Sequence, residues 1–402
     1  VYGFTHADVP SGFTFPSWEA ALRALGELPG QPKPIIVLDE FTYLISGNKA
    51  IPSIMQKVWD ETLKNTQIMI VLCGSYIGMM ETEVLGYQAP LYGRRTASTL
   101  LRPMDLASSA LFFPSYSAEE KFLTWAVVGG MPYYLRTFQD SQDVFANIRQ
   151  HILDAQSGTL FNEPRLLLME ELREPRNYFS LLRAIAQGRT RLNEIAQGAG
   201  IGDVTTVARY LDILQQMRLI TRRVPATETQ PEKSKKGIYH IDDHFLRFWF
   251  RYVHPNQSSL DLGLADAILQ QRIKPDLDHF IALAFEEAAI TFTSQLAQAG
   301  ELNFLPERIG GWWNRDAEID VLAFNLSEKL ALVGECKWTV HPVGVKVLDN
   351  LKQKAEILIK NHKIKQVKFA LFSRNGFTAE LEDRSKDEGI RLFTVDSLVS
   401  CL

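Results

Sequence analysis

The residues best suited to chemistry stand near the C-terminus, where Asp320 is followed by Glu335-x-Lys337. Both flanking runs are apolar enough to form buried strands, and the link between them is short and polar. If this hairpin turns about Ser327 and Glu328, Asp320 lies opposite Glu335, with Cβ atoms roughly 5 Å apart. Two facing carboxylates repel each other, whereas a cation such as Mg²⁺ binds them. The pattern predicts a metal site, although a polar hairpin face with an ordinary Glu–Lys ion pair has the same spacing.

A second set of polar residues follows two apolar runs in the first third of the chain. Asp39 and Glu40 come after the run 34–38, and Ser75 comes at the end of the run 67–74. The helical stretch between them favours a parallel α/β sheet, which gathers functional groups at the carboxyl ends of its strands. There Asp39 can hold the Mg²⁺ of a nucleotide, Glu40 can orient water, and Ser75 can contact the γ-phosphate. A helix N-cap is the alternative for Asp39 alone.

The middle of the chain has the order of a small helical domain with a hairpin. Amphipathic periodicity predicts helices over 179–186, 192–198 and 204–217, with strands over 218–224 and 237–241. Between residues 181 and 223 there are seven arginines against three acids, an excess of four positive charges. Such a local excess is expected for contacts with nucleic-acid phosphates.

This pattern resembles a winged helix-turn-helix domain. The resemblance implies DNA as a partner, with Thr205, Thr206 and Arg209 facing the major groove. Arg222 and Arg223 would then touch the DNA backbone. A packing module without DNA contact is the alternative for such a domain.

The length, composition and net charge of the chain limit the class of protein. The chain has 402 residues, 46% of them hydrophobic and 22% charged, with a net charge of −4. This is the composition of a multidomain globular protein, and it excludes a uniformly basic nucleic-acid coat. The three cysteines form no CxxC pair, which favours a reducing, cytoplasmic location. The sequence has no apolar run of 18 residues, so no membrane partner is expected.

The first third resembles the AAA-type ATPases that are common in archaea and also occur in bacteria. The motifs Pro-Leu-Tyr-Gly-Arg-Arg at 90–95 and Gly-Gly-Met-Pro at 129–132 add to the acid pair. The resemblance implies ATP and Mg²⁺ as cofactors and a homo-oligomer as one form of assembly. It assigns Asp39 and Glu40 to a Walker B motif, Ser75 to a sensor position, and Arg94 or Arg95 to the phosphate charge.

One motif of such ATPases does not occur in this sequence. The chain contains no Gly-x-x-x-x-Gly-Lys-Ser/Thr loop, whose backbone amides and lysine cradle the phosphates. A segment lost before Val1 is the favoured explanation, and a degenerate ATPase is the alternative. In either case the 402 residues alone are expected not to hydrolyse ATP.

The last third resembles the PD-(D/E)xK nuclease superfamily and the C-terminal domain of unknown function that accompanies this ATPase group. A helix over 277–299 carries Glu286, and Gly-Trp-Trp and Gly-Glu-Cys-Lys-Trp elements follow. The resemblance implies that Asp320, Glu335 and Glu286 hold Mg²⁺. Lys337 would orient water or stabilise the charged phosphorus. The segment 341–370 has seven lysines against two acids, which suits a phosphate backbone or an ordinary solvated helix.

The prediction is an α/β multidomain protein in four parts. They are a partial P-loop NTPase parallel sheet (1–105), a helical lid (106–172), a winged helix-turn-helix with a connector (173–260), and a restriction-endonuclease-like α/β domain (265–402). The predicted function is an ATP-binding ATPase coupled to DNA binding and a Mg²⁺-dependent endonuclease. The alternative is a nucleotide-switched signalling or transcription-regulating ATPase with an inactive nuclease-like module.

Overall fold

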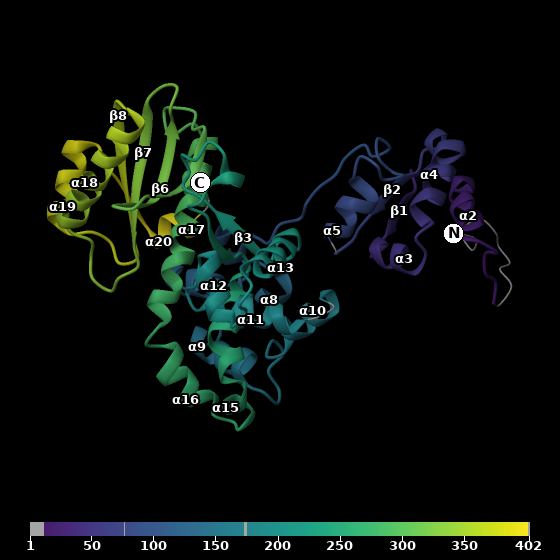
Figure 1. Ribbon diagram of the computed structural model, residues 1–402, viewed down its shortest axis with the longest axis horizontal. Coiled ribbons are helices and arrows are strands. Elements are labelled where there is room, and N and C mark those ends of the chain that lie inside the picture. The colour runs from purple at the N-terminus through teal and green to yellow at the C-terminus, as the bar shows by residue number, and fades with distance from the viewer. Residues whose placement is uncertain (1–11, 76, 173–174, 401–402) are drawn as a thin grey trace. The chain divides into compact units, whose positions relative to one another are not determined.

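A computed structural model describes residues 12–75, 77–172 and 175–400. The chain divides into two compact units, Val1–Leu101 and Arg102–Leu402 (Figure 1). Each unit is considered by itself below. Within the described residues, no helix is long and apolar enough to cross a membrane.

The first unit is built around strand β1 (Ile35–Leu38), which pairs in parallel with β2 (Met69–Leu72). Helix α4 (Ile51–Glu61) connects the two strands, as the sequence predicted, and buries Met55 and Val58. The remaining elements are α2 (Trp18–Arg23), η1 (Ala24–Glu27), α3 (Phe41–Gly47), η2 (Leu63–Asn65), α5 (Ile77–Met79) and η3 (Met80–Leu85).

The second unit begins with helices that cover the segment predicted as a lid. Helix α7 (Ala118–Val128) begins at a capping box, in which the Ser117 side chain accepts from the Glu120 N–H and Glu120 accepts from the Ser117 N–H. The other elements of this segment are α6 (Leu106–Ala110), α8 (Pro132–Thr137), α9 (Val144–Asn147), η4 (Ile148–Leu153) and α10 (Glu163–Glu171).

Three helices and a hairpin follow. Helix α13 (Val204–Gln216) begins where its N-cap Asp203 accepts the N–H groups of Thr205 and Thr206. Strand β3 (Ile220–Arg223) then pairs antiparallel with β4 (Ile238–Ile241). The earlier helices are α11 (Pro175–Ala186) and α12 (Leu192–Ala199), and η5 (Pro231–Lys233) lies between the strands.

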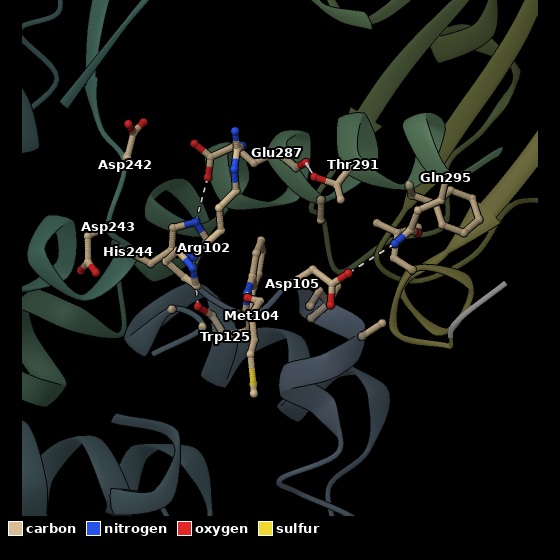
Figure 2. A pocket seen from close by; sticks show the side chains of 18 of the residues that line it. Arg102, Met104, Asp105, Trp125, Asp242, Asp243, His244, Glu287, Thr291 and Gln295 are labelled. Carbon is tan, nitrogen blue, oxygen red and sulfur yellow. Dashed lines mark hydrogen bonds and ion pairs between the residues drawn. The ribbon is translucent and has the colours of Figure 1, made fainter. Parts of the chain in front are cut away.

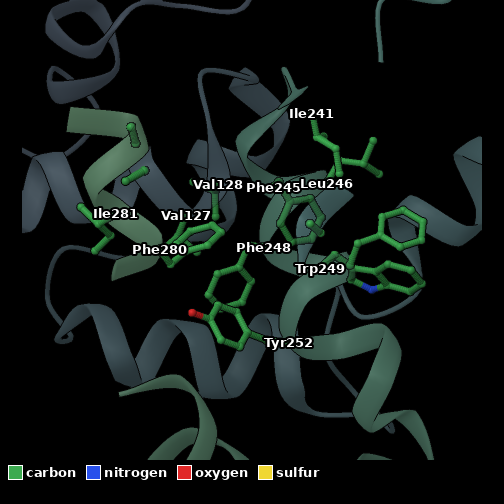
Figure 3. Packing of buried hydrophobic residues seen from close by; sticks show 14 of the residues in the cluster. Val127, Val128, Ile241, Phe245, Leu246, Phe248, Trp249, Tyr252, Phe280 and Ile281 are labelled. Atoms are coloured by element: carbon green, nitrogen blue, oxygen red, sulfur yellow. The ribbon is translucent and has the colours of Figure 1, made fainter. Parts of the chain in front are cut away.

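An aromatic segment joins this part to the rest of the second unit. Helix α14 (His244–Phe248) continues into the π-helix η6 (Trp249–Val253), and both bury nearly every side chain. Phe245, Phe248 and Tyr252 belong to the hydrophobic core, where they pack among Val127, Phe280 and their neighbours (Figure 3). The connector then contains η7 (His254–Asn256), α15 (Gln257–Asp261), α16 (Ala265–Ile268) and η8 (Leu269–Ile273).

The C-terminal part is a mixed sheet in the order β5-β6-β7-β8-β9. Strands β5 to β7 are antiparallel neighbours, whereas β8 and β9 run parallel to β7. The strands are β5 (Arg308–Trp313), β6 (Glu318–Asn325), β7 (Leu330–Lys337), β8 (Gln366–Ser373) and β9 (Arg391–Thr394), and the helices are α17 (Leu277–Gln298), α18 (Val345–His362), α19 (Ala379–Glu388) and α20 (Val395–Val399). The order along the chain is one helix, three strands, a helix and a strand, and α19, β9 and α20 extend it.

Alternate residues of β6 face two separate hydrophobic cores, as the period of a strand requires. Val321 and Ala323 pack in the core that includes α17, whereas Leu322 and Phe324 pack in the core that includes α18. Helices therefore cover both faces of this sheet. The α17 core also contains side chains of α7, α11, α13 and α14, so one continuous core runs through the second unit.

Gly130 offers a test of close backbone packing in the second unit. A Cβ atom at Gly130 would lie 1.9 Å from the carbonyl oxygen of Met104, while the Met104 N–H donates to the Gly130 carbonyl at 2.9 Å. We expect Gly130→Ala to lower the free energy of unfolding by about 3 kcal/mol or more, because backbone must shift to admit the methyl group. Chemical denaturation measures the loss. The control is Gly202→Ala, where nothing lies within 4 Å. Equal stability of the two variants would contradict this packing.

Candidate functional site

The predicted hairpin register is confirmed. Asn325 pairs with Leu330 and Val321 with Gly334, which centres the turn on Ser327 and Glu328 and brings Asp320 opposite Glu335. The Asp320 carboxylate accepts the Cys336 N–H at 2.8 Å. This hydrogen bond fixes the Asp320 side chain against β7, beside the residues with which it was predicted to act.

Glu335 is neutralised by two lysines. Its side chain lies in the protein interior, 5% exposed. The Lys337 Nζ atom donates to Oε1 at 2.7 Å, and the Lys354 Nζ atom donates to both carboxylate oxygens at 2.8 Å. Burial alone would lower the pKa of Lys337, but Glu335 and Asp320 raise it above the usual value. Lys337 therefore stays charged at neutral pH.

Lys354 is a site residue that the sequence analysis did not single out. It lies on α18, within the lysine-rich segment that was noted for its charge. The lysine-rich composition of that segment was the signal that could have pointed to a basic residue at the site. It could not identify Lys354 among its seven lysines, because which of them faces β7 depends on how α18 packs on the sheet.

Glu286 and Asp320 are carboxyl groups with raised pKa values. Burial, with the charges of Asp320, Glu318 and Glu287, raises the pKa of Glu286 to about 8. Burial, with the charge of Glu335, raises the pKa of Asp320 to about 6. At neutral pH Glu286 can donate a proton and Asp320 can accept one, which suits general acid–base chemistry. We call Glu286, Asp320, Glu335, Lys337 and Lys354 the acid–lysine site.

The predicted three-carboxylate Mg²⁺ set is not assembled at the acid–lysine site. Among the residues that the structure describes, no group of three His, Cys, Asp or Glu side chains has a metal-binding arrangement. The physical reason is that both oxygens of Glu335 are engaged by Lys337 and Lys354. The arrangement does not fit a magnesium ion held by Glu286, Asp320 and Glu335, and no step is assigned to a metal there.

A cavity of about 830 Å³ adjoins the acid–lysine site. Glu286, Glu318 and Asp320 line one part of its wall. Its volume lies in the range of small-molecule sites, from about 300 to 1,000 Å³. We call it the large cavity; its basic residues are Arg223, Arg247, Arg251, Arg308, His240 and His279.

A smaller cavity of about 460 Å³ lies beside a buried ion network (Figure 2). The two ring nitrogens of His244 lie 3.0 Å from the Trp125 carbonyl and 2.9 Å from Glu287 Oε2. Arg247 donates to the same carboxylate at 2.9 Å, and Arg223 pairs with its other oxygen. Burial alone would raise the pKa of Glu287, but Arg247, Arg223 and His244 hold it well below its usual range. The network is charge-compensated, which indicates a structural role.

In the first unit, the predicted nucleotide residues gather at the carboxyl ends of β1 and β2. Glu40 has the left-handed backbone angles φ 47° and ψ 46°, which a non-glycine residue adopts at an energetic cost. The Ser75 hydroxyl donates to Glu40 Oε2 at 2.9 Å, and the Asp39 side chain accepts the Glu40 N–H at 3.0 Å. Asp39 is exposed. The two strand ends are thus joined through the side chain of Glu40.

Of the two candidate arginines in this unit, Arg94 has intramolecular partners. Its Nε and Nη2 atoms contact Asp60 at 3.0 and 2.6 Å, and its Nη1 atom donates to the Pro90 and Tyr92 carbonyls. Arg95 is exposed. Arg94 is therefore held by partners within the first unit.

Comparison with known proteins supports the ATPase assignment. Residues 8–138 match a family described as an ATPase domain predominantly from Archaea, and residues 249–356 match a family of "Archaea bacterial proteins of unknown function". The uncharacterized protein MJECL04 of Methanocaldococcus jannaschii is 36% identical over 323 residues, which span 80% of this chain and 70% of that protein. The chain belongs to the archaeal ATPase-domain family.

Two further proteins resemble this ATPase-domain protein, one over a short stretch and one at low sequence identity. The uncharacterized protein MJ0424 of Methanocaldococcus jannaschii is 46% identical over 43 residues, 11% of this chain and 42% of its own length. The crystal structure of protein VC1899 from Vibrio cholerae aligns over 91% of this chain and 88% of that one, at 13% identity and a TM-score of 0.22. That TM-score is too low to support an argument about fold.

The residues of this ATPase-domain protein predicted to bind DNA fall into two groups. On α13, Thr205 and Arg209 are exposed, while the Thr206 hydroxyl donates to Asp203 at 2.5 Å. On β3, Arg222 donates to the carbonyls of Pro231 and Ser234, and Arg223 pairs with Glu287. Both β3 guanidinium groups thus have partners within the protein, because the strand lies against the hairpin loop and α17.

The raised pKa of Glu286 predicts a pH-dependent stability. In the unfolded chain the pKa of this carboxyl is near its usual value of 4.5, whereas burial and neighbouring charge raise it to about 8 in the folded chain. Folding stability is therefore lost as pH rises across that window. Glu286→Gln should match wild type at pH 4.5 and exceed it by on the order of 3 kcal/mol at pH 8.5, measured by chemical denaturation.

The control for this measurement is Glu356→Gln, a change at an exposed position of α18. Its stability relative to wild type should not vary across the same pH range. A difference between Glu286→Gln and wild type that is constant with pH would show that burial and neighbouring charge do not raise this pKa.

Proposed function

We propose that this ATPase-domain protein is an ATP-dependent protein that binds DNA and acts on its phosphodiester backbone. The nucleotide belongs to the first unit, and the DNA contacts and the acid–lysine site belong to the second. The ATPase part agrees with the family match over residues 8–138. The DNA-directed part rests on the arrangement of side chains in the second unit.

The observation that carries the proposal is the meeting of acidic and basic groups from three elements. The charge of Asp320 on β6 helps to raise the pKa of Glu286 on α17, and Lys337 lies two residues beyond Glu335 on β7. A phosphodiester bound there would meet a carboxylate able to accept a proton from water, a carboxyl group able to donate one, and an ammonium group for the charge on phosphorus. Stability alone gives no reason to bury two carboxyls with raised pKa values.

The nucleotide part rests on the strand ends of the first unit. When it is bound with a nucleotide, Mg²⁺ neutralises part of the phosphate charge. The residues fit this role, since Asp39 is an exposed carboxylate at a strand end. Asp39 would hold the ion, and Glu40, positioned by the Ser75 hydroxyl, would orient water. The P-loop motif does not occur within the 402 residues, so these residues are half of a nucleotide site.

The phosphodiester activity is tested with supercoiled plasmid DNA and the whole chain. We expect nicking that is lost in Asp320→Ala and in Lys337→Ala, with rates reduced about 100-fold or more because each change removes an acid–base or charge-stabilising group. Assays with Mg²⁺ and with EDTA report whether a cation takes part. The matched control is Asp316→Ala, at an exposed acid that lies outside the acid–lysine site. Intact plasmid under all conditions would reject this activity.

DNA binding is tested separately from cleavage. Arg209 is an exposed arginine on α13, and we expect Arg209→Ala to weaken DNA affinity several-fold. The slope of log affinity against log salt concentration should become shallower by about one, because one phosphate contact is lost. Arg272→Ala removes an exposed arginine from η8 and should bind like wild type. Fluorescence anisotropy over a series of salt concentrations measures both quantities. Equal affinity and equal slope for the two variants would exclude α13 as the contact.

One observation favours a second candidate function. The two lysines on Glu335 give the acid–lysine site a satisfied ion-pair network, which is also what a non-catalytic domain would keep. In that case the protein is a nucleotide-switched signalling or transcription-regulating ATPase, and the C-terminal domain is an interaction module. Site-specific DNA binding without cleavage, or no DNA binding, distinguishes this candidate from the first.

A further inference from the structure

Lys354 stands at the edge of the apolar stripe by which α18 packs on the sheet. Leu351, Ala355 and Leu358 of this helix are buried in a core that also contains side chains of β6 and β7. Lys354 comes three residues after Leu351 and four before Leu358, and residues at these spacings are neighbours on a helix surface. Helix periodicity therefore brings a charged side chain within reach of Glu335 on β7.

Glu335 points toward α18 and is enclosed there by two ammonium groups. Ala331 and Val333 pack in the α18 core, and alternate residues of a strand share a face. The Lys354 Nζ atom lies 2.8 Å from both oxygens of Glu335, and the Lys337 Nζ atom lies 2.7 Å from Oε1. The side chain of Glu335 is 7% exposed, whereas those of Lys354 and Lys337 are 29% and 36% exposed. A carboxylate enclosed in this way needs a cation beside it.

The charges around this carboxylate are balanced. Burial and the charge of Glu335 raise the pKa of Asp320 to about 6, and the charges of Lys337 and Lys354 oppose that rise. Glu286 has a pKa of about 8, so it is mostly protonated at neutral pH and adds little negative charge. Two ammonium groups therefore face two carboxylates.

A divalent cation could enter this arrangement only by displacing a lysine. Ions such as Mg²⁺ and Mn²⁺ bind carboxylate oxygens, and both oxygens of Glu335 are already engaged. An added ion would also leave two uncompensated positive charges. We propose that Lys354 supplies the positive charge that a divalent cation would otherwise bring to Glu335 and Asp320, so that the acid–lysine site binds no such ion while Lys354 is in place. This inference does not require that DNA be cleaved.

The experiment is calorimetric titration of the whole chain with Mn²⁺ alone. Lys354→Met keeps an unbranched apolar side chain but removes the charge, which frees the oxygens of Glu335. We expect this variant to bind Mn²⁺ about tenfold or more tightly than wild type, because affinity for such an ion rises with the uncompensated charge of its ligands. The matched control is Lys352→Met, which removes a lysine of the same helix that pairs with Glu388 on α19. It should bind Mn²⁺ like wild type, and any binding by the first unit is common to all variants.

Two further variants locate the gained ion and separate charge from side-chain packing. Asp320→Asn added to Lys354→Met should abolish the gained affinity, and Lys354→Arg, which keeps the charge, should bind like wild type. Because an ion that binds only the folded chain raises Tm, Mn²⁺ should also raise the Tm of Lys354→Met more than that of wild type. Lys354→Gln takes the place of Lys354→Met if the latter does not fold.

Three results would overturn the proposal. The first is a folded, uncharged variant at position 354 that gains no affinity for Mn²⁺, since Lys354 would then be an ordinary structural ion pair. The second is wild type that binds Mn²⁺ as tightly as that variant. The third is a gain that persists when Asp320→Asn is added, because the ion would then bind elsewhere.

Discussion

The second unit depends on one buried carboxylate, that of Glu287 on α17. It contacts Arg223 from β3 and both His244 and Arg247 from α14. His244 in turn contacts the Trp125 carbonyl on α7. One side chain therefore connects four elements that lie far apart in the sequence. Removing one partner from such a network leaves a buried charge uncompensated, which is far more costly than losing an exposed ion pair. This explains why the helices, the hairpin and the C-terminal sheet form a single compact unit.

The neighbouring residue on α17 has the opposite electrostatic environment. Glu287 faces three basic groups and has a lowered pKa, whereas Glu286 faces Asp320 and Glu318 and has a raised one. Burial acts on both carboxyls in the same direction, so the difference comes from the charges they meet. The ion network thus positions Glu286 at the acid–lysine site while Glu287 stabilises the fold. A helix that carries both residues links the stability of the second unit to the chemistry of its candidate site.

The two units carry different kinds of candidate site. In the first, a strained glutamate and a serine join the ends of two parallel strands, which suits positioning of water at a nucleotide. In the second, a lysine-neutralised glutamate and two carboxyls lie beside a cavity of about 830 Å³. The family match supports the ATPase part for residues 8–138, while the relatives that were found are uncharacterized. The proposal for DNA therefore rests on side-chain geometry.

The sequence by itself determined the local features. Alternation of apolar residues and a short polar link were enough to set the β6–β7 register. The strand-end positions of Asp39 and Ser75 followed from the apolar runs before them. These features depend on neighbours in sequence or on one hairpin, where the period of the backbone decides which way a side chain points.

Only the tertiary structure decided the partners of the charged residues. Lys354 meets Glu335 because α18 packs over β7, and Arg223 meets Glu287 across 64 residues of sequence instead of remaining available for DNA. Arg94 is paired with Asp60 for the same kind of reason. An ion pair depends on which surfaces pack together, and the sequence around each charge carries little information about that. This is why the site residues on β6 and β7 were predicted, whereas the lysine that completes the site and the network that supports it were not.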